Sequence, residues 1–590
     1  MVFYEKNIKI SLLATIRKVI LIIIAYFCTS KKDTYHFVNN LNMEKSALQK
    51  ERAAYQPKLP KALNGAVKVK EGAPTQSVDN QEEIKNLFPN TYGMPVVEFV
   101  ESDEPNNKRI NVGVILSGGQ APGGHNVITG LFDQIKKLNP ENRLYGFILG
   151  PNGLVEHDYM ELTKEIVDDY RNTGGFDMIG SGRTKLEEEE QFEKGLEILR
   201  ELDIKALVII GGDDSNTNAC VLAEYYAAKN CGVQVIGCPK TIDGDLKNEQ
   251  IETSFGFDTA TKTYSELIGN IERDCNSARK YWHFIKVMGR SASHIALECA
   301  LQCQPNVCII SEEVEKNDMT LNQIVDNLCQ VIAFRASQGN HFGTVIVPEG
   351  LIEFIPAIGR LIQELNDLLA AHGAEYKDLD ADAQREYIIA HLSKENAATF
   401  ETLPADVARQ LSLDRDPHGN VQVSLIETEK LLSDMCAAKL EKWKAEGKFV
   451  GNFAAQHHFF GYEGRCADPS NFGADYCYAL GFNAACLIKA GVTGYMSSVR
   501  NLTKPSVQWI AGGIPITMMM NMERRHGKMK PVIQKALVHL DGAPFLKYAS
   551  KRDDWAVNTS YVYPGPIQYF GPAEVCDQPT MTLKYEHQGK

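Results

Sequence analysis

The chain has 590 residues, of which 44% are hydrophobic and 23% charged, an ordinary globular composition that excludes global disorder, collagen and a coiled coil. A formal net charge of −13 argues against general nucleic-acid binding, so an anionic substrate must be bound by local Lys and Arg side chains. Since a single core rarely exceeds about 250–300 residues, the length predicts at least two domains. Fourteen cysteines are too few for a disulfide scaffold and indicate reduced thiols in the cytoplasm.

The start of the chain carries one short apolar run, VILIIIAYF at 19–27, which follows Arg17 and Lys18. A positive segment before an apolar run resembles a signal peptide or a membrane anchor. The run is nevertheless too short, because a membrane-spanning helix needs about 20 mostly apolar residues. We therefore expect translation to begin at Met43, residues 1–42 to be a non-native extension, and the protein to bind no membrane. A targeting role for the run is the alternative.

Residues 43–108 contain several prolines and no sustained period, which predicts an irregular, partly helical N-terminal arm. From Arg109 onward, short apolar runs alternate with helical segments. The runs lie at 110–116, 143–149, 206–210, 233–238, 283–288, 307–310 and 343–347. Continuous runs of Val and Ile are typical of strands buried on both faces of a parallel sheet. Strands that alternate with helices predict a doubly wound α/β fold, in which ligands bind at the carboxyl ends of the strands.

The pattern becomes helical after Pro348. We expect a helix over 354–372 and a helical insertion over 373–448, whose clearest amphipathic segment is 426–446. The α/β pattern then returns, with a helix over 472–490 and a strand over 494–498. The predicted division is a first α/β domain at 109–255 completed by part of 466–560, a second at 256–372 completed by 449–465, and a C-terminal tail at 561–590.

Polar loops follow several of the predicted strands. Glycines in the segment 117–124 let the backbone approach an anion at the start of a helix near His125, although a plain strand–helix turn is the alternative. Asp213 and Asp214 follow the strand at 206–210. Adjacent carboxylates at a strand end favour a Mg²⁺ ligand, whereas the alternative is that one of them only caps a helix over 216–229.

A further polar loop follows the strand at 233–238 and supplies Lys240, Thr241, Asp243 and Asp245. In an extended loop the two aspartates point the same way, which provides a candidate general base and a supporting acid. Shorter loops follow two other strands, Met288-Gly289-Arg290 before a helix over 291–302, and Pro348-Glu349-Gly350. Each loop alone could be an ordinary turn, but several polar loops at neighbouring strand ends favour one shared site.

The motifs SGGQAPGG, GGDD, PKTIDGD, FGFDTA, MGR, PEG and YEGR occur in this order between residues 44 and 560. Together they resemble the phosphofructokinase family, and within it the long pyrophosphate-dependent form. The resemblance implies two Rossmann-like domains and Mg²⁺-dependent, reversible phosphoryl transfer from pyrophosphate to the 1-hydroxyl of fructose 6-phosphate, giving fructose 1,6-bisphosphate and phosphate. It also implies a cytoplasmic homodimer that acts in glycolysis, with active sites shared across the interface.

The same resemblance implies roles for individual residues. Asp243 matches the general base, Asp213 the Mg²⁺ ligand and Gly119 the glycine at the phosphoryl donor. Arg183 matches the arginine that bridges the transferring phosphate. The remaining substrate contacts match Thr241, Ile242, Met288, Gly289, Arg290, Glu349, Tyr462, Glu463, Gly464 and Arg465, and Lys280 and Tyr281 match residues that reach a partner subunit.

Two positions bear on the phosphoryl donor, because ATP-using relatives carry glycine where this chain has Asp214 and Lys240. A carboxylate at Asp214 occupies the space that the α-phosphate region of a nucleotide would need, and it repels that phosphate. Lys240 adds a point charge suited to compact pyrophosphate. The alternatives are an ATP-dependent phosphofructokinase, a non-catalytic phosphosugar-sensing regulatory subunit, and a membrane-anchored binding protein. A regulatory subunit should have lost Asp213 or Asp243, and this chain keeps both.

Overall fold

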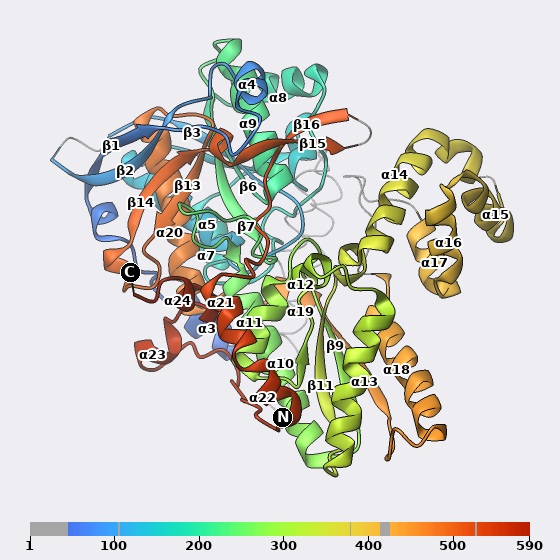
Figure 1. The fold of residues 1–590 in the computed structure, drawn as a ribbon. Helices are drawn as coiled ribbons and strands as arrows, with labels where there is room; N and C mark the ends of the chain where they lie inside the picture. Colours follow the sequence, from blue (N-terminus) through green and yellow to red (C-terminus); the bar gives the residue numbers. More distant parts are fainter. Residues whose placement is uncertain (1–44, 104–106, 378, 414–424, 526–527, 590) are drawn as a thin grey trace, which may run out of the picture.

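The computed structural model describes residues 45–103, 107–377, 379–413, 425–525 and 528–589. Two β-sheets rich in parallel pairs are each covered by helices on both faces, so the predicted doubly wound α/β class is confirmed (Figure 1). Within these ranges no helix is both long and apolar enough to cross a membrane. The predictions for residues 1–42 lie outside the described residues.

The larger sheet has ten strands in the order β1-β2-β14-β13-β7-β6-β3-β4-β5, with β8 beside β7. Its centre, from β13 to β4, is parallel, and its edges are antiparallel. The strands are β1 (Ala66–Pro74), β2 (Pro95–Ser102), β3 (Asn111–Leu116), β4 (Leu144–Phe147), β5 (Tyr159–Glu161), β6 (Ile204–Gly211), β7 (Gln234–Thr241), β8 (Phe255–Gly256), β13 (Tyr495–Arg500) and β14 (Ile510–Pro515).

Helices cover both faces of this sheet, because successive side chains of a strand point to opposite faces. Val114 of β3 packs in one core with α5 (Gly124–Leu138) and α20 (Asn471–Ala490), whereas Ile115 packs in another with α8 (Glu189–Glu201) and α9 (Asp213–Ala228). Helices α5 and α20 cross at a glycine, since a Cβ at Gly481 would lie 1.8 Å from the carbonyl oxygen of Val127. The continuous apolar runs of the sequence are thus explained by burial on two sides.

The smaller sheet is parallel throughout, in the order β10-β11-β9-β12. Its strands are β9 (Trp282–Val287), β10 (Val307–Cys308), β11 (Gly343–Pro348) and β12 (Ala455–Phe460). One face packs on α10 (Phe257–Ala278) and α11 (His294–Cys303), and the other packs on α12 (Ser311–Lys316), α13 (Leu321–Ser337) and α18 (Thr428–Ala445). The division of the chain at the predicted domain boundaries stays a prediction.

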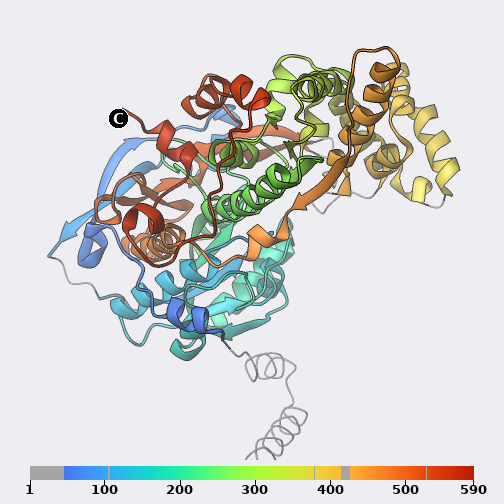
Figure 2. The ribbon, with the colours of Figure 1, turned by 90° about the horizontal axis from the view of Figure 1, so that it is seen from below.

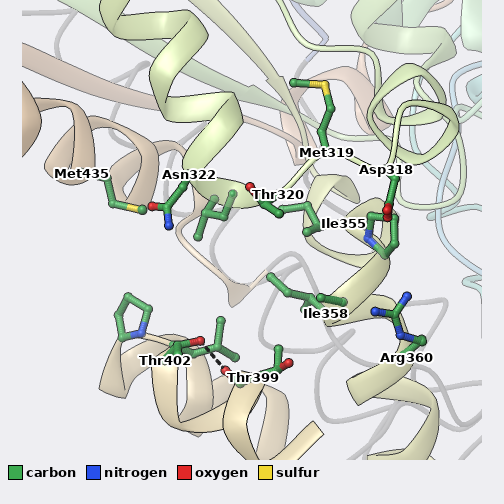
Figure 3. Close-up of a pocket in the computed structure, with 15 residues that line it drawn as sticks. Asp318, Met319, Thr320, Asn322, Ile355, Ile358, Arg360, Thr399, Thr402 and Met435 are labelled. Carbon is green, nitrogen blue, oxygen red and sulfur yellow. Dashed lines mark hydrogen bonds between the residues drawn. The ribbon is translucent and has the colours of Figure 1, made fainter. Parts of the chain in front are cut away.

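The predicted helical insertion is helical in the described residues. The separately predicted helix over 354–372 is α14 (Pro356–Lys377), and the helices within 373–448 are α15 (Ala381–His391), α16 (Lys394–Thr402), α17 (Ala405–Ser412) and α18. Figures 1 and 2 both place α14 to α17 at one end of the molecule, away from β1 and β2. A cavity of about 430 Å³ lies where these helices meet the body, and Figure 3 shows Ile355, Ile358 and Met435 in its wall. No predicted site residue lines this cavity.

Residues 43–108 correct one expectation, because the predicted irregular arm supplies two strands. Strand β1 pairs with β2, and β2 pairs with β14 at the edge of the larger sheet. Val97 and Phe99 of β2 are buried while their neighbours along the strand are less so, which is the alternation of a strand with one buried face. Prolines around this segment interrupt the alternation of buried and less buried residues, so the sequence pattern did not predict the strand. Helices α3 (Ala47–Ala53) and α4 (Gln81–Leu87) flank β1.

The C-terminal part adds a two-stranded hairpin and short helices. The hairpin consists of β15 (Met520–Arg525) and β16 (Lys528–Ile533). The remaining short helices are α6 (Pro151–Val155), α7 (Lys164–Asp169), α19 (Tyr462–Cys466), α21 (Ala543–Ala549), α22 (Arg552–Val557), α23 (Ala573–Cys576) and α24 (Met581–Glu586). The predicted tail is fastened to the body, because the buried carboxylate of Glu298 accepts the amides of Met581 and Thr582, each at 2.6 Å.

Candidate active site

The carboxyl ends of parallel strands from both sheets carry the predicted loops. In the larger sheet, Leu116 pairs with Ile210, and Gly211 pairs with Pro239, so β3, β6 and β7 end at one edge. In the smaller sheet, Val287 pairs with both Pro348 and Phe460. The segments that follow these strands therefore start side by side, as expected for a ligand site of an α/β fold.

The loop between β3 and α5 lies against two arginines. Its amide at Gly118 donates to the carbonyl of Gly182 at 2.8 Å, which holds the loop beside the segment that carries Arg183. A Cβ at Gly119 would lie 2.4 Å from Nη1 of Arg465 and 3.3 Å from Nη2 of Arg183. Both guanidinium groups thus sit on the loop at a position that only glycine leaves open.

Lys240 is a buried cation beside the same loop. Strand β7 runs to Thr241 instead of ending at 238, because Lys240 and Thr241 pair with β8. The side chain is only 7% exposed and has no hydrogen bond or ion pair with another described residue. Burial, together with the positive charges of Arg465 and Arg183, lowers the pKa of Lys240 to about 8. The negative charges of Asp243 and Asp213 offset this effect only in part, and an anionic ligand would offset the remaining cost of the buried cation.

Asp213 and Asp214 lie in the first turn of α9. The predicted helix over 216–229 therefore begins three residues earlier, where the helix dipole stabilises carboxylates. Nζ of Lys535 lies 3.7 Å from Oδ2 of Asp213, and Nη1 of Arg525 donates to Oδ1 of Asp214 at 3.0 Å. Burial raises the pKa of Asp213, but the positive charges of Lys535 and Arg525 outweigh burial and hold it below its ordinary value.

The loop after β7 places two further aspartates in different surroundings. The amide of Asp243 donates to Oγ1 of Thr241 at 3.0 Å, and the Asp243 side chain stays half-buried. Asp245 is buried. Burial, followed by the negative charges of Asp243 and Asp213, raises the pKa of Asp245 to about 7. The half-buried Asp243 can thus reach solvent or a substrate, whereas the buried Asp245 cannot do so as readily.

The smaller sheet contributes a second group of contacts. The buried carboxylate of Glu349 accepts the amide of Gly289 at 3.2 Å, and burial, followed by the charge of Asp243, raises the pKa of Glu349. Nε of Arg465 donates to Sδ of Met288 at 3.2 Å. Because the same guanidinium lies on Gly119, Arg465 joins the loops of the two sheets. Arg290 lies in the loop before α11, which begins at His294 instead of the predicted 291.

Other predicted contacts turn out to have structural partners. Ile242 is a core residue with 3% exposure, so only its main chain can face a ligand. Glu463 accepts the amide of Gly461 at 2.8 Å, and a Cβ at Gly464 would lie 2.6 Å from Cζ of Tyr264. Tyr462 is exposed, with the Arg465 guanidinium carbon 5.7 Å from its ring centroid.

Lys280 and Tyr281 are not brought to these loops. They precede β9, whose six residues separate them from Met288. At about 3.3 Å per residue this is a separation of about 20 Å. Nζ of Lys280 lies 5.0 Å from the Tyr281 ring centroid at that far end of the smaller sheet. Within one chain they cannot contact a ligand bound at the strand ends.

Two cations of the site were missed by the sequence reasoning. Arg525 ends β15, and Lys535 follows β16 and donates to Oγ of Ser291 at 2.7 Å. Burial lowers the pKa of Lys535, but the charges of Asp213 and Asp245 outweigh burial and raise it. The only signal in the sequence was a run of cations over 524–535 in an acidic protein.

The carboxylates fit a partial Mg²⁺ site. Within the described residues, no group of three or more His, Cys, Asp or Glu side chains could hold a metal. Mg²⁺ is usually held by one or two carboxylates together with waters and substrate phosphates, so such a group is not required. The Asp213 side chain is 22% exposed, and its charge acts on Asp245 together with that of Asp243. Asp213 can therefore serve as the protein ligand of a substrate-bound cation.

Comparisons with known proteins bear on the family of this chain. The family model described as Phosphofructokinase matches residues 111–398. Three relatives bear the name pyrophosphate–fructose 6-phosphate 1-phosphotransferase. They come from Porphyromonas gingivalis (65% identical, covering 92% of this chain and 99% of the relative), Treponema pallidum (56%; 92% and 97%) and Entamoeba histolytica (55%; 92% and 100%).

Two solved structures are more distant. The pyrophosphate-dependent phosphofructokinase from Nitrosospira multiformis is 17% identical with a TM-score of 0.47, covering 68% of this chain and 82% of its own. The one from Marinobacter aquaeolei is 16% identical with a TM-score of 0.48, covering 77% and 93%. The assignment rests instead on the relatives of 55–65% identity, which match over almost their whole length. On these grounds the chain belongs to the phosphofructokinase family, as its motifs predicted.

Proposed function

We propose that this protein reversibly transfers a phosphoryl group from pyrophosphate to the 1-hydroxyl of fructose 6-phosphate, giving fructose 1,6-bisphosphate and phosphate. The observation that carries the proposal is Lys240, a buried cation that forms no hydrogen bond or ion pair with another described residue and lies beside a glycine loop and two arginines. Such a pocket suits a compact polyanion. The names of the relatives at 55–65% identity support the same reaction.

The donor would lie between the Gly119 loop and the three cations Lys240, Arg183 and Arg465. The sugar's 1-hydroxyl oxygen forms a bond to the terminal phosphorus of pyrophosphate, and the bond from that phosphorus to the bridging oxygen breaks. The bond's electron pair passes to the leaving phosphate, and the hydroxyl proton passes to the Asp243 carboxylate. The chain's part is positioning and electrostatic stabilisation, as in other phosphoryl transfers. Mg²⁺ bound through Asp213 would neutralise charge on the phosphates.

Asp243 would act as the general base. Its charge acts on Lys240, on the donor side, and on Glu349, on the side of the smaller sheet. It is therefore close to both groups of loops. Thr241 orients it through the hydrogen bond to its amide. Asp245, with its raised pKa, would act as the supporting acid.

The sugar phosphate would be bound mainly by the loops of the smaller sheet. Met288, Gly289, Arg290 and Glu349 lie at its strand ends, and Arg465 follows β12. Thr241, Ile242, Tyr462, Glu463 and Gly464 would complete the contacts, Ile242 through its main chain. A guanidinium is the group best suited to a phosphate that does not react, because its planar fork forms two parallel hydrogen bonds.

We further propose a homodimer in which Lys280 and Tyr281 complete the active site of the second copy. Their position at the far end of β9 supports this, since they cannot serve their own site. We also propose that the protein is cytoplasmic and that it acts in glycolysis. The cysteines of the described residues are free and most are buried, which fits a reducing compartment.

The test is ³¹P NMR of the purified protein with fructose 6-phosphate, pyrophosphate and Mg²⁺. We expect fructose 1,6-bisphosphate and phosphate to form together, and the reverse reaction to regenerate pyrophosphate. Asp243→Asn is the matched control, because it keeps the shape of the side chain and removes the base. Binding of fructose 6-phosphate without turnover would contradict the proposal and favour a phosphosugar-sensing subunit.

A further inference from the structure

The hairpin of β15 and β16 is anchored to both sides of the donor loops. The amide of Ile533 donates to Oγ1 of Thr217 on α9 at 3.2 Å, and Nζ of Lys530 donates to Glu187 at 2.9 Å, close to the segment of Arg183. At its base, the amide of Val78 donates to the carbonyl of Met520 at 3.0 Å. Figure 1 shows the hairpin running beside α9. Its strands are thus fixed relative to the two aspartates.

The guanidinium of Arg525 donates hydrogen bonds to two carboxylates. Nη1 donates to Oδ1 of Asp214 at 3.0 Å, and Nη2 donates to Oε2 of Glu523 at 3.3 Å. Glu523 and Arg525 are two residues apart on one strand, so their side chains leave the same face. The side chains of Arg525 and Asp214 are 18% and 21% exposed, which limits screening of the pair by salt. Glu523 therefore holds the arginine, and the arginine holds Asp214.

We infer that Arg525 is a positioning residue that sets phosphoryl-donor specificity through Asp214. The inference rests on the proposed function and on the expectation from the sequence that Asp214 excludes ATP. A carboxylate can obstruct a larger donor only if it stays in one orientation, because a side chain free to change rotamer moves out of the way. The planar fork of arginine fixes that orientation, whereas a lysine would supply charge without the second contact.

The measurement is the ratio of kcat/KM with pyrophosphate to kcat/KM with ATP. We expect Arg525→Ala to lower this ratio about tenfold or more, since it removes a charge-assisted hydrogen bond. Arg524→Ala is the matched control, because Arg524 is the exposed neighbour on the same strand and carries the same charge. It should leave the ratio within about twofold. Arg525→Lys should recover turnover with pyrophosphate but not the full ratio. An unchanged ratio in Arg525→Ala would overturn the inference.

A double-mutant cycle with Asp214→Ala separates this inference from the proposed role of Asp214. If Arg525 acts through Asp214, the double variant should match Asp214→Ala within about twofold. Additive effects, or an effect of Asp214→Ala alone, would overturn the role of Arg525 and leave that of Asp214. An unchanged ratio in Asp214→Ala would overturn both. Should Arg525→Ala fail to fold, Glu523→Gln loosens the arginine without removing it and should shift the ratio in the same direction.

Discussion

Lys240 should make the use of pyrophosphate depend on pH. Its pKa is lowered to about 8 by burial and by two neighbouring guanidinium groups, so its charge is lost as the pH rises through that value. With a pKa of about 8, the charged fraction falls from about 0.9 at pH 7 to about 0.1 at pH 9. If only the ammonium form binds the donor, kcat/KM for pyrophosphate should fall roughly tenfold over this range, because kcat/KM reports the pKa values of the enzyme form that binds the donor.

The assay is the initial rate at low pyrophosphate, with fructose 6-phosphate and Mg²⁺ held saturating, across the pH range. Lys240→Arg is the charge-retaining control, because arginine stays protonated throughout. Titration of pyrophosphate itself affects both enzymes equally and cancels in the ratio of wild type to variant. That ratio of kcat/KM values should fall as the pH rises. Lys240→Met should have a low kcat/KM for pyrophosphate at every pH. Parallel profiles for wild type and Lys240→Arg would refute the role of a titrating lysine.

Further predictions concern the proposed base Asp243, the phosphate-binding Arg465 and a buried ion pair. Asp243→Asn should lower kcat by about 10²–10⁴-fold with unchanged binding of fructose 6-phosphate by calorimetry, and near-normal turnover would remove Asp243 as the base. Arg465→Ala should raise KM for fructose 6-phosphate and, because its guanidinium lies on Gly119, for pyrophosphate. A fall in kcat alone, in kinetics with each substrate varied, would place Arg465 elsewhere. Glu429→Ala should cost about 3–5 kcal/mol in urea unfolding, since it strips the buried Lys286 of a carboxylate 3.3 Å away, and a loss below about 1 kcal/mol would show that this pair is not stabilising.

Local patterns predicted the parts of the fold that depend on local burial. The parallel strands were predictable because burial on both faces requires continuous apolar residues, as at Val114 and Ile115. Strand β2 was missed because prolines interrupt a one-sided pattern around Val97 and Phe99. Strand β7 extends further than expected because it pairs with β8, which its own sequence does not reveal.

In the candidate site, too, local features were predictable from the sequence and long-range contacts were not. The loops after the strands were predictable because the topology of an α/β fold brings them together. The contact of Arg525 with Asp214 joins residues 311 positions apart and depends on where the hairpin packs. The contact of Arg465 with the Gly119 loop likewise depends on how the two sheets face each other. Long-range ion pairs of this kind leave no local period or spacing in the sequence.

The central claim is that the phosphoryl donor is pyrophosphate. The most direct measurement is kcat/KM of the unmodified protein with pyrophosphate and with ATP, each with fructose 6-phosphate and Mg²⁺. We expect turnover with pyrophosphate and almost none with ATP, because the proposed function has Lys240 bind a compact polyanion and Asp214, which accepts a hydrogen bond from Arg525, obstruct a longer donor. Efficient turnover with ATP, or none with pyrophosphate, would contradict the account.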